Sequence, residues 1–175
     1  MQSGMVIDAV RITDGPNLLD ADLHLPEHAR GLVVFAHGSG SSRFSSRNRQ
    51  VADYLNKGHF ATLLLDLLTQ AEEGIDVRTA EFRFDIQLLG RRVVAATDWA
   101  AHHPVVGRLP IGYFGASTGA GGDDEPVIEM NETALRRMRA PVELAIVPGA
   151  THLFEEPGTL EEVERLALDW LNRHL

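Results

Sequence analysis

The stretch that decides the fold is Gly31–Ser42, which reads GLVVFAHGSGSS. Its first half is a short, continuously apolar run, as expected of a strand covered on both faces in a parallel sheet. Its second half is a loop of small residues that begins with His37. A second apolar run, Ala61–Leu65 (ATLLL), has the same character, and between the two runs Asn48–Lys57 has the pattern of a helix that ends at Gly58. This alternation predicts parallel strands joined by a helix.

The segments on either side extend this pattern. Upstream, two strand-like segments flank a turn at Asp14–Pro16, and the second alternates apolar and polar residues, which predicts an antiparallel pair with one wet face. Downstream, the spacing of Thr159 and Glu162 predicts a capping box at the start of the last helix. The expected strands are Met5–Thr13, Leu19–Leu25, Ile111–Phe114 and Val142–Val147, and the further expected helices are Ile86 to about Ala101, Pro126–Met138 and Thr159 to about Leu171. We therefore expect one α/β domain over residues 1–175, with a mainly parallel sheet, helices on both faces and an antiparallel N-terminal strand pair.

Composition narrows the class of protein. The 175 residues carry a net charge of −9 and no cysteine. An acidic surface repels phosphate groups, so we expect binding neither to nucleic acid nor to a membrane. The lack of cysteine excludes a disulfide framework, a thiolate metal site and a cysteine nucleophile. No signal peptide and no apolar stretch of about 20 residues is visible, which predicts a cytoplasmic location.

A serine follows the expected strand at Ile111–Phe114. Residues 115–119, Gly-Ala-Ser-Thr-Gly, fit G-x-S-x-G, in which small residues allow a sharp turn that exposes the hydroxyl of Ser117. The alternative is a glycine-rich turn without a catalytic role, and the motif alone favours neither. The loop after His37 can supply one backbone N–H group of an oxyanion hole, and Thr118 the other. A phosphate-binding loop fits poorly, because the P-loop lysine and its spacing are missing.

The later polar residues follow the chain order of a serine hydrolase triad. His152 follows the expected strand Val142–Val147, and a histidine there can accept the serine proton near neutral pH. The acid is expected between serine and histidine, where Gly121–Val127 (GGDDEPV) offers Asp123 and Asp124. We select Asp124, although the motif barely separates it from Asp123, and helix capping is the alternative role for a carboxylate here.

The histidines other than His152 are expected to have no catalytic role. His37 is expected to shape its loop rather than act as a base. The others have no comparable setting and are expected at the surface: His24, His28, His59, His102, His103 and His174. No group of His, Asp and Glu shows ligand spacing on one element, so no metal is expected. Hydrolysis through an acyl-serine intermediate also needs no organic cofactor, and none is expected.

Four blocks occur together along the chain: HGSGSSR, GYFGASTGA, GGDDEPV and GATHLFEEPG. In this order they resemble the dienelactone-hydrolase-like branch of the α/β-hydrolase superfamily, and the resemblance covers nearly the whole chain. It implies an α/β-hydrolase fold with a catalytic triad and an oxyanion hole. The matching residues are Ser117 as nucleophile, Asp124 as acid, His152 as base, and Ser39 and Thr118 as donors of the oxyanion N–H groups. Arg43 and Arg47 also match family positions, and surface salt bridges are their simplest role.

The connection between nucleophile and acid departs from the family pattern. Only six residues separate Ser117 from Asp124, where relatives have a helix and further strands. We therefore expect a contracted α/β-hydrolase fold in which Val142–Val147 pairs beside Ile111–Phe114 and the triad is held loosely, with weak activity. Apolar faces exposed by the contraction predict a dimer or higher homo-oligomer, with exchange of elements between chains as one form.

Three functions are compatible with these observations. The first is a carboxylesterase or lactonase that cleaves a small ester or lactone through an acyl-serine intermediate. The second is a catalytically impaired or non-enzymatic remnant, natural or engineered by deletion, that acts as a scaffold or interaction module. The third is a thioesterase, because the same triad serves several leaving groups.

Overall fold

The chain divides into two structural units. The computed structural model describes residues 4–38, 40–116, 141–151 and 154–175. The first unit comprises Met1–Gly115 together with Leu175, and the second comprises Ala116–His174. The expectation of a single domain over residues 1–175 stays a prediction.

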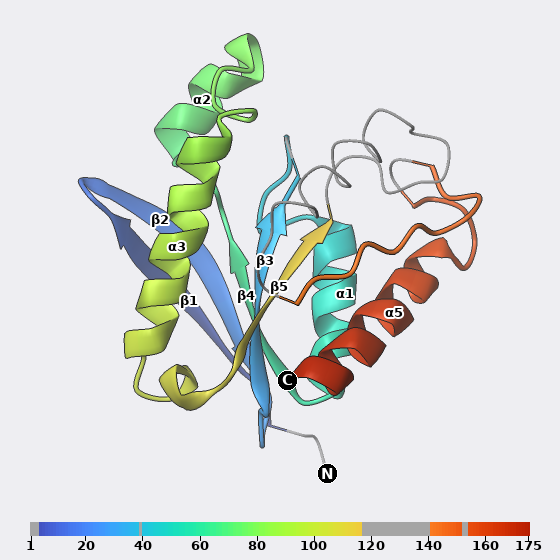
Figure 1. Cartoon of the computed structure of the whole chain (residues 1–175). Helices are drawn as coiled ribbons and strands as arrows, with labels where there is room; N and C mark the ends of the chain where they lie inside the picture. Colours follow the sequence, from blue (N-terminus) through green and yellow to red (C-terminus); the bar gives the residue numbers. More distant parts are fainter. Residues whose placement is uncertain (1–3, 39, 117–140, 152–153) are drawn as a thin grey trace. The chain divides into compact units, whose positions relative to one another are not determined.

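A five-stranded sheet lies at the centre of the first unit. Its strands are β1 (Val6–Asp14), β2 (Asn17–Leu25), β3 (Gly31–His37), β4 (Phe60–Leu65) and β5 (Ile111–Ala116), in the spatial order β1-β2-β4-β3-β5. β2 pairs antiparallel with β1 and β4, whereas β3 and β4 are parallel. Figure 1 shows β5 running in the direction of β3, and the N–H of Leu32 donates to the carbonyl oxygen of Pro110 at 2.9 Å, which joins the amino ends of these two strands. The predicted antiparallel pair and parallel strands are therefore confirmed, in one mixed sheet.

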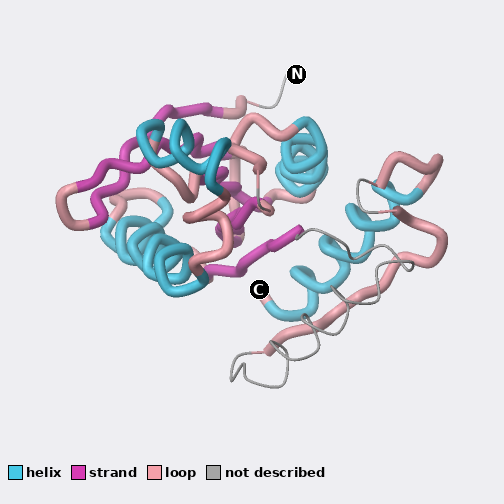
Figure 2. The backbone as a smooth tube through the Cα atoms, turned by 90° about the horizontal axis from the view of Figure 1, so that it is seen from above, coloured by secondary structure: helices cyan, strands magenta, loops and turns pink. Residues whose placement is uncertain are grey.

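Helices cover both faces of this sheet. They are α1 (Ser46–Lys57) and α3 (Ile86–His102), both close to the predicted ranges. Asn56 of α1 donates from Nδ2 to the hydroxyl of Thr62 at 3.2 Å, whereas Ala96 of α3 packs in a cluster that contains the next strand residue, Leu63. Successive side chains of a strand point to opposite faces, so α1 and α3 lie on opposite sides of the sheet, as Figure 2 shows from above.

One helix of the first unit escapes prediction from the sequence. It is α2 (Gln70–Thr79), and a capping box starts it. The hydroxyl of Thr69 accepts the N–H of Glu72 at 3.3 Å, and the carboxylate of Glu72 accepts the N–H of Thr69 at 2.8 Å. The spacing of Thr69 and Glu72 is the sequence signal for this helix.

Gly90 lies inside α3, with open space where a side chain would project. Glycine inside a helix costs roughly 0.5–1 kcal/mol relative to alanine, so Gly90→Ala is expected to raise the free energy of unfolding by about that amount, measured by urea denaturation. Gly107 is the matched control, because a Cβ there would lie 2.6 Å from the carbonyl oxygen of Ala101. Gly107→Ala is therefore expected to destabilise the protein, and equal shifts for the two substitutions would contradict this assignment.

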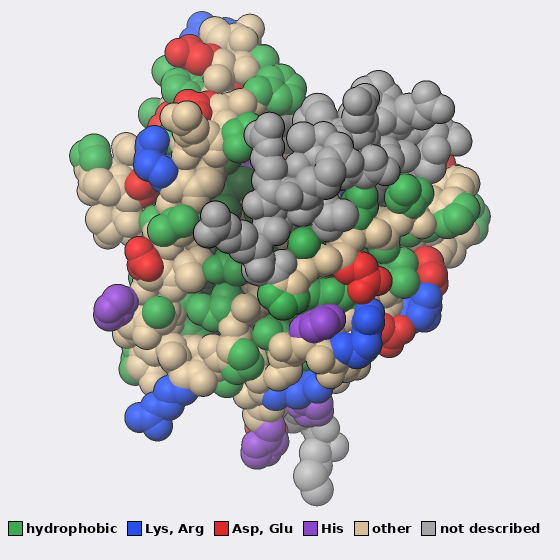
Figure 3. All heavy atoms as spheres, in the orientation of Figure 1, with side chains coloured by type: hydrophobic (Ala, Val, Ile, Leu, Met, Phe, Trp, Pro, Cys, Tyr) green, Lys and Arg blue, Asp and Glu red, His purple; other side chains and the backbone are tan. Residues whose placement is uncertain are grey.

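Apolar side chains reach the surface along α3, as Figure 3 shows. Ile86 and Val94 are 73% and 59% exposed, and Tyr113 of β5 is also more than half exposed. The hydroxyl of Tyr113 lies 2.8 Å from the hydroxyl of Thr97, so β5 reaches the flank of α3 here. Exposed apolar surface is where association between chains is expected, and the predicted homo-oligomer stays a prediction.

The described part of the second unit contains one helix, α5 (Thr159–His174), which starts as predicted. The predicted capping box does not form. Thr159 is itself helical and donates its hydroxyl to the carbonyl oxygen of Glu156 at 2.7 Å, while the carboxylate of Glu162 accepts two hydrogen bonds from Arg165. The reason is position, because a capping side chain must stand one residue before the helix.

The strand predicted at Val142–Val147 is wrong. Residues 141–146 form no regular secondary structure, and Val147 makes only an isolated bridge, so the expected extended strand is not formed. Val142 and Ile146 are 41% and 43% exposed, whereas a strand of a covered parallel sheet is buried on both faces. The predicted helix Pro126–Met138 lies outside the described residues.

Candidate active site

The site residues predicted from the sequence all lie outside the described residues. They are Ser117, Thr118, Asp124 with its alternative Asp123, His152 and Ser39. Their described neighbours are Gly38 and Gly40 around position 39, Ala116 before Ser117, and Thr151 before His152. These neighbours show from which elements the candidate residues emerge.

Ser117 comes directly after a strand, because β5 ends at Ala116. The strand is two residues longer than predicted, so the G-x-S-x-G motif begins within the end of β5 and Ser117 is the first residue after it. β3 and β4 pair in parallel up to Ala36 opposite Leu65. Since parallel neighbours share an edge at their carboxyl ends, the segments that leave β3, β4 and β5 begin at one edge of the sheet. Ligands of α/β sheets bind at this edge.

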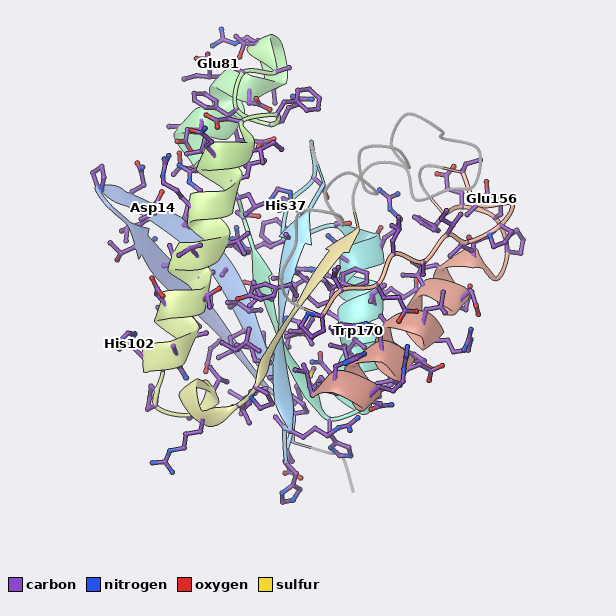
Figure 4. All side chains as sticks on the ribbon, in the orientation of Figure 1. Asp14, His37, Glu81, His102, Glu156 and Trp170 are labelled. Atoms are coloured by element: carbon purple, nitrogen blue, oxygen red, sulfur yellow. The ribbon has the colours of Figure 1, made fainter. Side chains whose placement is uncertain are left out.

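His37 lies at the end of β3, and both of its ring nitrogens form hydrogen bonds with backbone groups. Its Nε2 accepts the N–H of Leu67 at 2.9 Å, so Nδ1 carries the proton and donates to the carbonyl oxygen of Gly38 at 2.9 Å. A histidine held in this way has no free nitrogen for a substrate proton. The prediction that His37 shapes its loop is confirmed, and Figure 4 shows the residue on β3.

Two arginines and two aspartates hold the loop between β3 and α1. The guanidinium of Arg43 pairs with Asp66, whose carboxylate also accepts the backbone N–H of Arg43 at 2.6 Å. Arg43 Nε lies 3.5 Å from Asp22, and Arg49 of α1 pairs with the other oxygen of Asp22 at 3.3 Å. The ring of Phe44 lies against both guanidinium groups, 4.2 and 4.9 Å from its centroid. The salt-bridge role expected for Arg43 is therefore confirmed, but the pairs are mostly buried.

Two contacts join the residues on either side of His152. The N–H of Thr151 donates to the carboxylate of Glu156 at 3.0 Å, and the N–H of Phe154 donates to the carbonyl oxygen of Thr151 at 3.1 Å. Hydrogen bonds from Thr151 hold the pKa of Glu156 below its usual value. Glu156 is therefore joined by a hydrogen bond to Thr151, the residue before His152.

His24 is buried, so its prediction as a surface residue is wrong. It is 8% exposed and lies on β2 opposite Thr62, on the face that Asn56 of α1 covers. The alternation of β2 assigns this face to solvent, but α1 covers part of it. Four other histidines are exposed as predicted, and one is half-buried with its ring 4.9 Å from Trp99. The exposed residues are His28, His59, His102 and His174, and the half-buried one is His103.

Neither a metal site nor a membrane-spanning helix is found among the residues that the structure describes. Within these ranges, no group of three or more His, Cys, Asp or Glu side chains is arranged to hold a metal ion. The helices found in the same ranges are all too short or too polar to cross a membrane.

A mixed sheet with helices on both faces, an antiparallel hairpin at its start and a G-x-S-x-G serine directly after a parallel strand defines an α/β hydrolase. Comparison with solved structures identifies the family. A dienelactone hydrolase from Anabaena variabilis is 43% identical and has a TM-score of 0.89, over 98% of this chain and 99% of that one. The chain therefore belongs to the dienelactone-hydrolase-like family of α/β hydrolases, which confirms the predicted resemblance and the contracted α/β-hydrolase fold.

Two more distant structures share the fold. Est1E from Butyrivibrio proteoclasticus is 15% identical, over 94% of this chain and 98% of its own, and has a TM-score of 0.71. A dienelactone hydrolase-like promiscuous phosphotriesterase from metagenomic libraries is 16% identical, over 97% of this chain and 98% of its own, and also has a TM-score of 0.71. At these identities the likeness shows the fold alone. No protein-family model matches the chain.

The curated relatives are longer proteins. Two Mycobacterium tuberculosis proteins, each named "Putative phosphoribosyl transferase", are 42% identical over 210 aligned positions, which cover 96% of this chain and 46% of each relative. The chain thus spans about half the length of the curated relatives it matches. The 210 aligned positions exceed the 175 residues of this chain by 35, so the relatives carry residues within the matched region that this chain lacks. This difference agrees with the contraction expected from the sequence.

Proposed function

We propose that this protein is a serine hydrolase that cleaves small carboxylic esters or lactones. The observation that carries the proposal is that β5 ends at Ala116, the residue before Ser117, at the sheet edge where the loop after β3 also begins. The nearly full-length similarity to a dienelactone hydrolase supports the same class of reaction. Acyl transfer needs a nucleophile and oxyanion donors at one place, and these two segments supply both kinds of group.

In the proposed reaction, Ser117 Oγ attacks the carbonyl carbon while His152 accepts the hydroxyl proton and Asp124 orients the imidazole. The backbone N–H groups of Ser39 and Thr118 stabilise the oxyanion. The tetrahedral intermediate then releases the alcohol, which takes the proton from His152, and an acyl-serine remains. Water, deprotonated by His152, attacks the acyl carbon, and the carboxylic acid leaves as Ser117 regains its proton.

One observation favours a second candidate, a catalytically impaired remnant that acts as a scaffold or interaction module. The chain lacks at least 35 positions that its curated relatives have in the matched region, and a shortened connection would hold the triad loosely. The name of those relatives does not favour phosphoribosyl transfer by this chain. The similarity covers 46% of each, whereas the match to the dienelactone hydrolase covers both chains almost completely.

A fluorophosphonate probe tests the nucleophile, because it reacts with a serine that an adjacent base activates. The folded protein is expected to be labelled at Ser117, as mapped by mass spectrometry of the peptides, and the urea-unfolded protein is expected to stay unlabelled. No labelling at concentrations that label ordinary esterases would favour the impaired remnant. If Ser117 is labelled, rates of hydrolysis for oxyester and thioester substrates with the same acyl group will distinguish an esterase from a thioesterase.

A further inference from the structure

We propose that the free edge of β1 pairs with β1 of a second copy of this chain, in an antiparallel arrangement around a twofold axis. β1 stands at the end of the strand order, so its outer side has no neighbouring strand in the described part of the chain (Figure 1). Its nine residues pair with β2 in an unbroken register, and no bulge bends the edge away. β1 also contains no lysine and no proline, which commonly protect such edges. This inference does not depend on the proposed reaction.

The backbone groups that face outward from β1 are those of its odd-numbered residues. The N–H of Asp66 donates to the carbonyl oxygen of Asp20 at 2.9 Å, so the even-numbered residues of β2 bond toward β4. The odd-numbered residues of β2 therefore bond toward β1, where their partners are even-numbered, as in the pair of Leu19 and Ile12. The groups left at the outer edge belong to four residues: Ile7, Ala9, Arg11 and Thr13. An antiparallel strand can pair with each of them.

A hollow of about 490 Å³ lies beside the carboxyl end of β1. It is lined by residues 13–15, at the end of β1 and in the turn, and by Ala95, Trp99 and His102 of α3. Figure 4 shows Asp14 and His102 on these two elements. The hollow is open to a strand added at this edge, whose side chains on the α3 side would enter it.

The contacts of α3 show that this hollow faces the β1 edge. The hydroxyl of Thr97 lies 2.8 Å from the hydroxyl of Tyr113 in β5, so one flank of the helix faces the opposite end of the sheet. Ala95 and Trp99 lie two residues before and after Thr97, which places them on the other flank of the helix. That flank therefore faces β1 and the space next to its outer edge.

The amino end of β1 carries an apolar side chain that suits this hollow. The even-numbered residues of β1 face α3, since Ile12 is fully buried in one cluster with Ala96. Val6 belongs to the same face but is 52% exposed. A twofold axis perpendicular to the sheet keeps both α3 helices on one side and brings the amino end of each β1 to the carboxyl end of the other. Val6 of each copy then lies beside the hollow of the other copy, so the surface is self-complementary.

The charges of β1 restrict the position of the axis. With Ala9 or Val10 at the axis, Asp8 and Arg11 each face an uncharged residue of the second copy. An axis at Asp8 would place two carboxylates directly opposite each other, and an axis at Arg11 would do the same with two guanidinium groups. Like charges directly opposite each other destabilise a strand pair. The two central registers are therefore favoured, and both keep most of the two strands paired.

Sedimentation velocity of the full chain, at concentrations up to about 1 mM, tests the association. One strand pair is a small interface beside the roughly 1,200–2,000 Å² of stable complexes, so we expect a reversible dimer that dissociates on dilution. Val6→Lys is expected to raise the Kd of the dimer at least about tenfold, because the ammonium group would be buried without a partner. Ala9→Pro is expected to weaken the dimer as well, because it removes an outward N–H and keeps the bonds to β2.

Val94→Lys is the matched control. Val94 is 59% exposed on α3, so the change has the same chemistry as Val6→Lys but lies on the apolar surface shared with Tyr113. We expect this variant to keep the wild-type Kd. Urea denaturation of each variant shows that it is folded.

Crosslinking locates the interface independently, because the chain contains no cysteine of its own. In the two favoured registers the Cα atoms of the two Ala9 residues are about 5.5 Å or roughly 7–8 Å apart. A short bismaleimide is therefore expected to join two copies of Ala9→Cys. Leu18→Cys is the control, because Leu18 is 52% exposed but lies on the inner strand β2.

Four results would overturn the inference. They are a protein that stays monomeric at every concentration, a dimer that Val6→Lys leaves intact, an equal loss of the dimer in Val6→Lys and Val94→Lys, and crosslinking at position 18 as efficient as at position 9. A dimer that Val94→Lys alone disrupts would assign the interface to the exposed surface of α3 instead.

Discussion

Ser117→Ala is expected to lower kcat/KM for a short-chain p-nitrophenyl ester by at least about a thousandfold. The reason is that a serine hydrolase without its hydroxyl loses the covalent step and retains only what substrate binding and the oxyanion donors provide. The free energy of unfolding is expected to change by less than about 0.5 kcal/mol, because the substitution removes a single oxygen atom. Steady-state kinetics and urea denaturation of the purified variant measure the two quantities.

Ser46→Ala is the control for this substitution. Ser46 is an exposed serine in the first turn of α1, so the variant undergoes the same chemical change and is expected to keep the wild-type rate. Both variants are purified by the same procedure as the wild type, which exposes a contaminating esterase. Turnover that persists in Ser117→Ala at the wild-type rate would remove Ser117 as the nucleophile.

The sheet is the part of the fold that the sequence predicts best. β3 and β4 are continuous apolar runs, and β2 alternates apolar and polar residues, so their burial follows directly from the period of the pattern. The run at Val142–Val147 is mostly apolar but includes the charged Glu143, and it does not form a strand. Apolar residues alone do not decide whether a strand forms, because strand formation depends on the tertiary context.

α2, by contrast, is an element that forms although its sequence has no apolar pattern. Its sequence, QAEEGIDVRT, has no apolar stripe, and its buried residue is Asp76. The carboxylate of Asp76 accepts hydrogen bonds from the N–H groups of Phe82 and Arg83, so the helix is held by polar contacts with the following loop. Hydrophobic periodicity therefore cannot predict this helix, and only the capping box of Thr69 and Glu72 signals it.

The candidate site likewise has one part that the sequence predicts and another part that it does not. The motif around Ser117 is visible in the sequence because the sharp turn requires small residues at fixed spacing. The ion pairs that hold the loop between β3 and α1 are not visible, because Asp22, Arg43 and Asp66 are more than 20 residues apart and meet only when β2, β3 and β4 pair. Asp66 directly follows an apolar strand, and a polar residue at that place is the one signal for its role.

Arg92→Ala is expected to lower the free energy of unfolding by about 3–5 kcal/mol, the usual cost of removing one partner of a buried ion pair. The Arg92 side chain is 0% exposed. Its guanidinium donates to both oxygens of Glu72 at 2.7 Å, to the carbonyl oxygen of Leu67 at 2.6 Å and to Asp14 at 3.3 Å. Since whole domains are stable by only about 5–15 kcal/mol, urea denaturation will show this loss clearly.

This loss is expected to depend on pH. Burial alone would raise the pKa of Glu72, but hydrogen bonds from Arg92 and Thr69 outweigh it and hold the pKa below its usual value of 4.5. A carboxyl group whose pKa is lowered by folding stabilises the protein above its unfolded pKa, and this stabilisation is lost as the pH falls through the folded pKa. The difference in stability between wild type and Arg92→Ala should therefore be largest near neutral pH and smaller below about pH 4.

Arg91→Ala is the matched control, because Arg91 is the exposed neighbour of Arg92 on α3 and a change of less than about 0.5 kcal/mol is expected there. Arg92→Met removes the charge but fills most of the space of the arginine side chain. Any loss of stability that remains in this variant reflects the hydrogen-bond acceptors left without a donor.

Glu72 also caps α2, so breaking its bonds to Arg92 should release that helix before the sheet unfolds. Hydrogen exchange in residues 69–80 should then become faster in Arg92→Ala than exchange in β3 and β4. Equal acceleration everywhere would show that Arg92 stabilises the unit as a whole and does not hold α2 in particular.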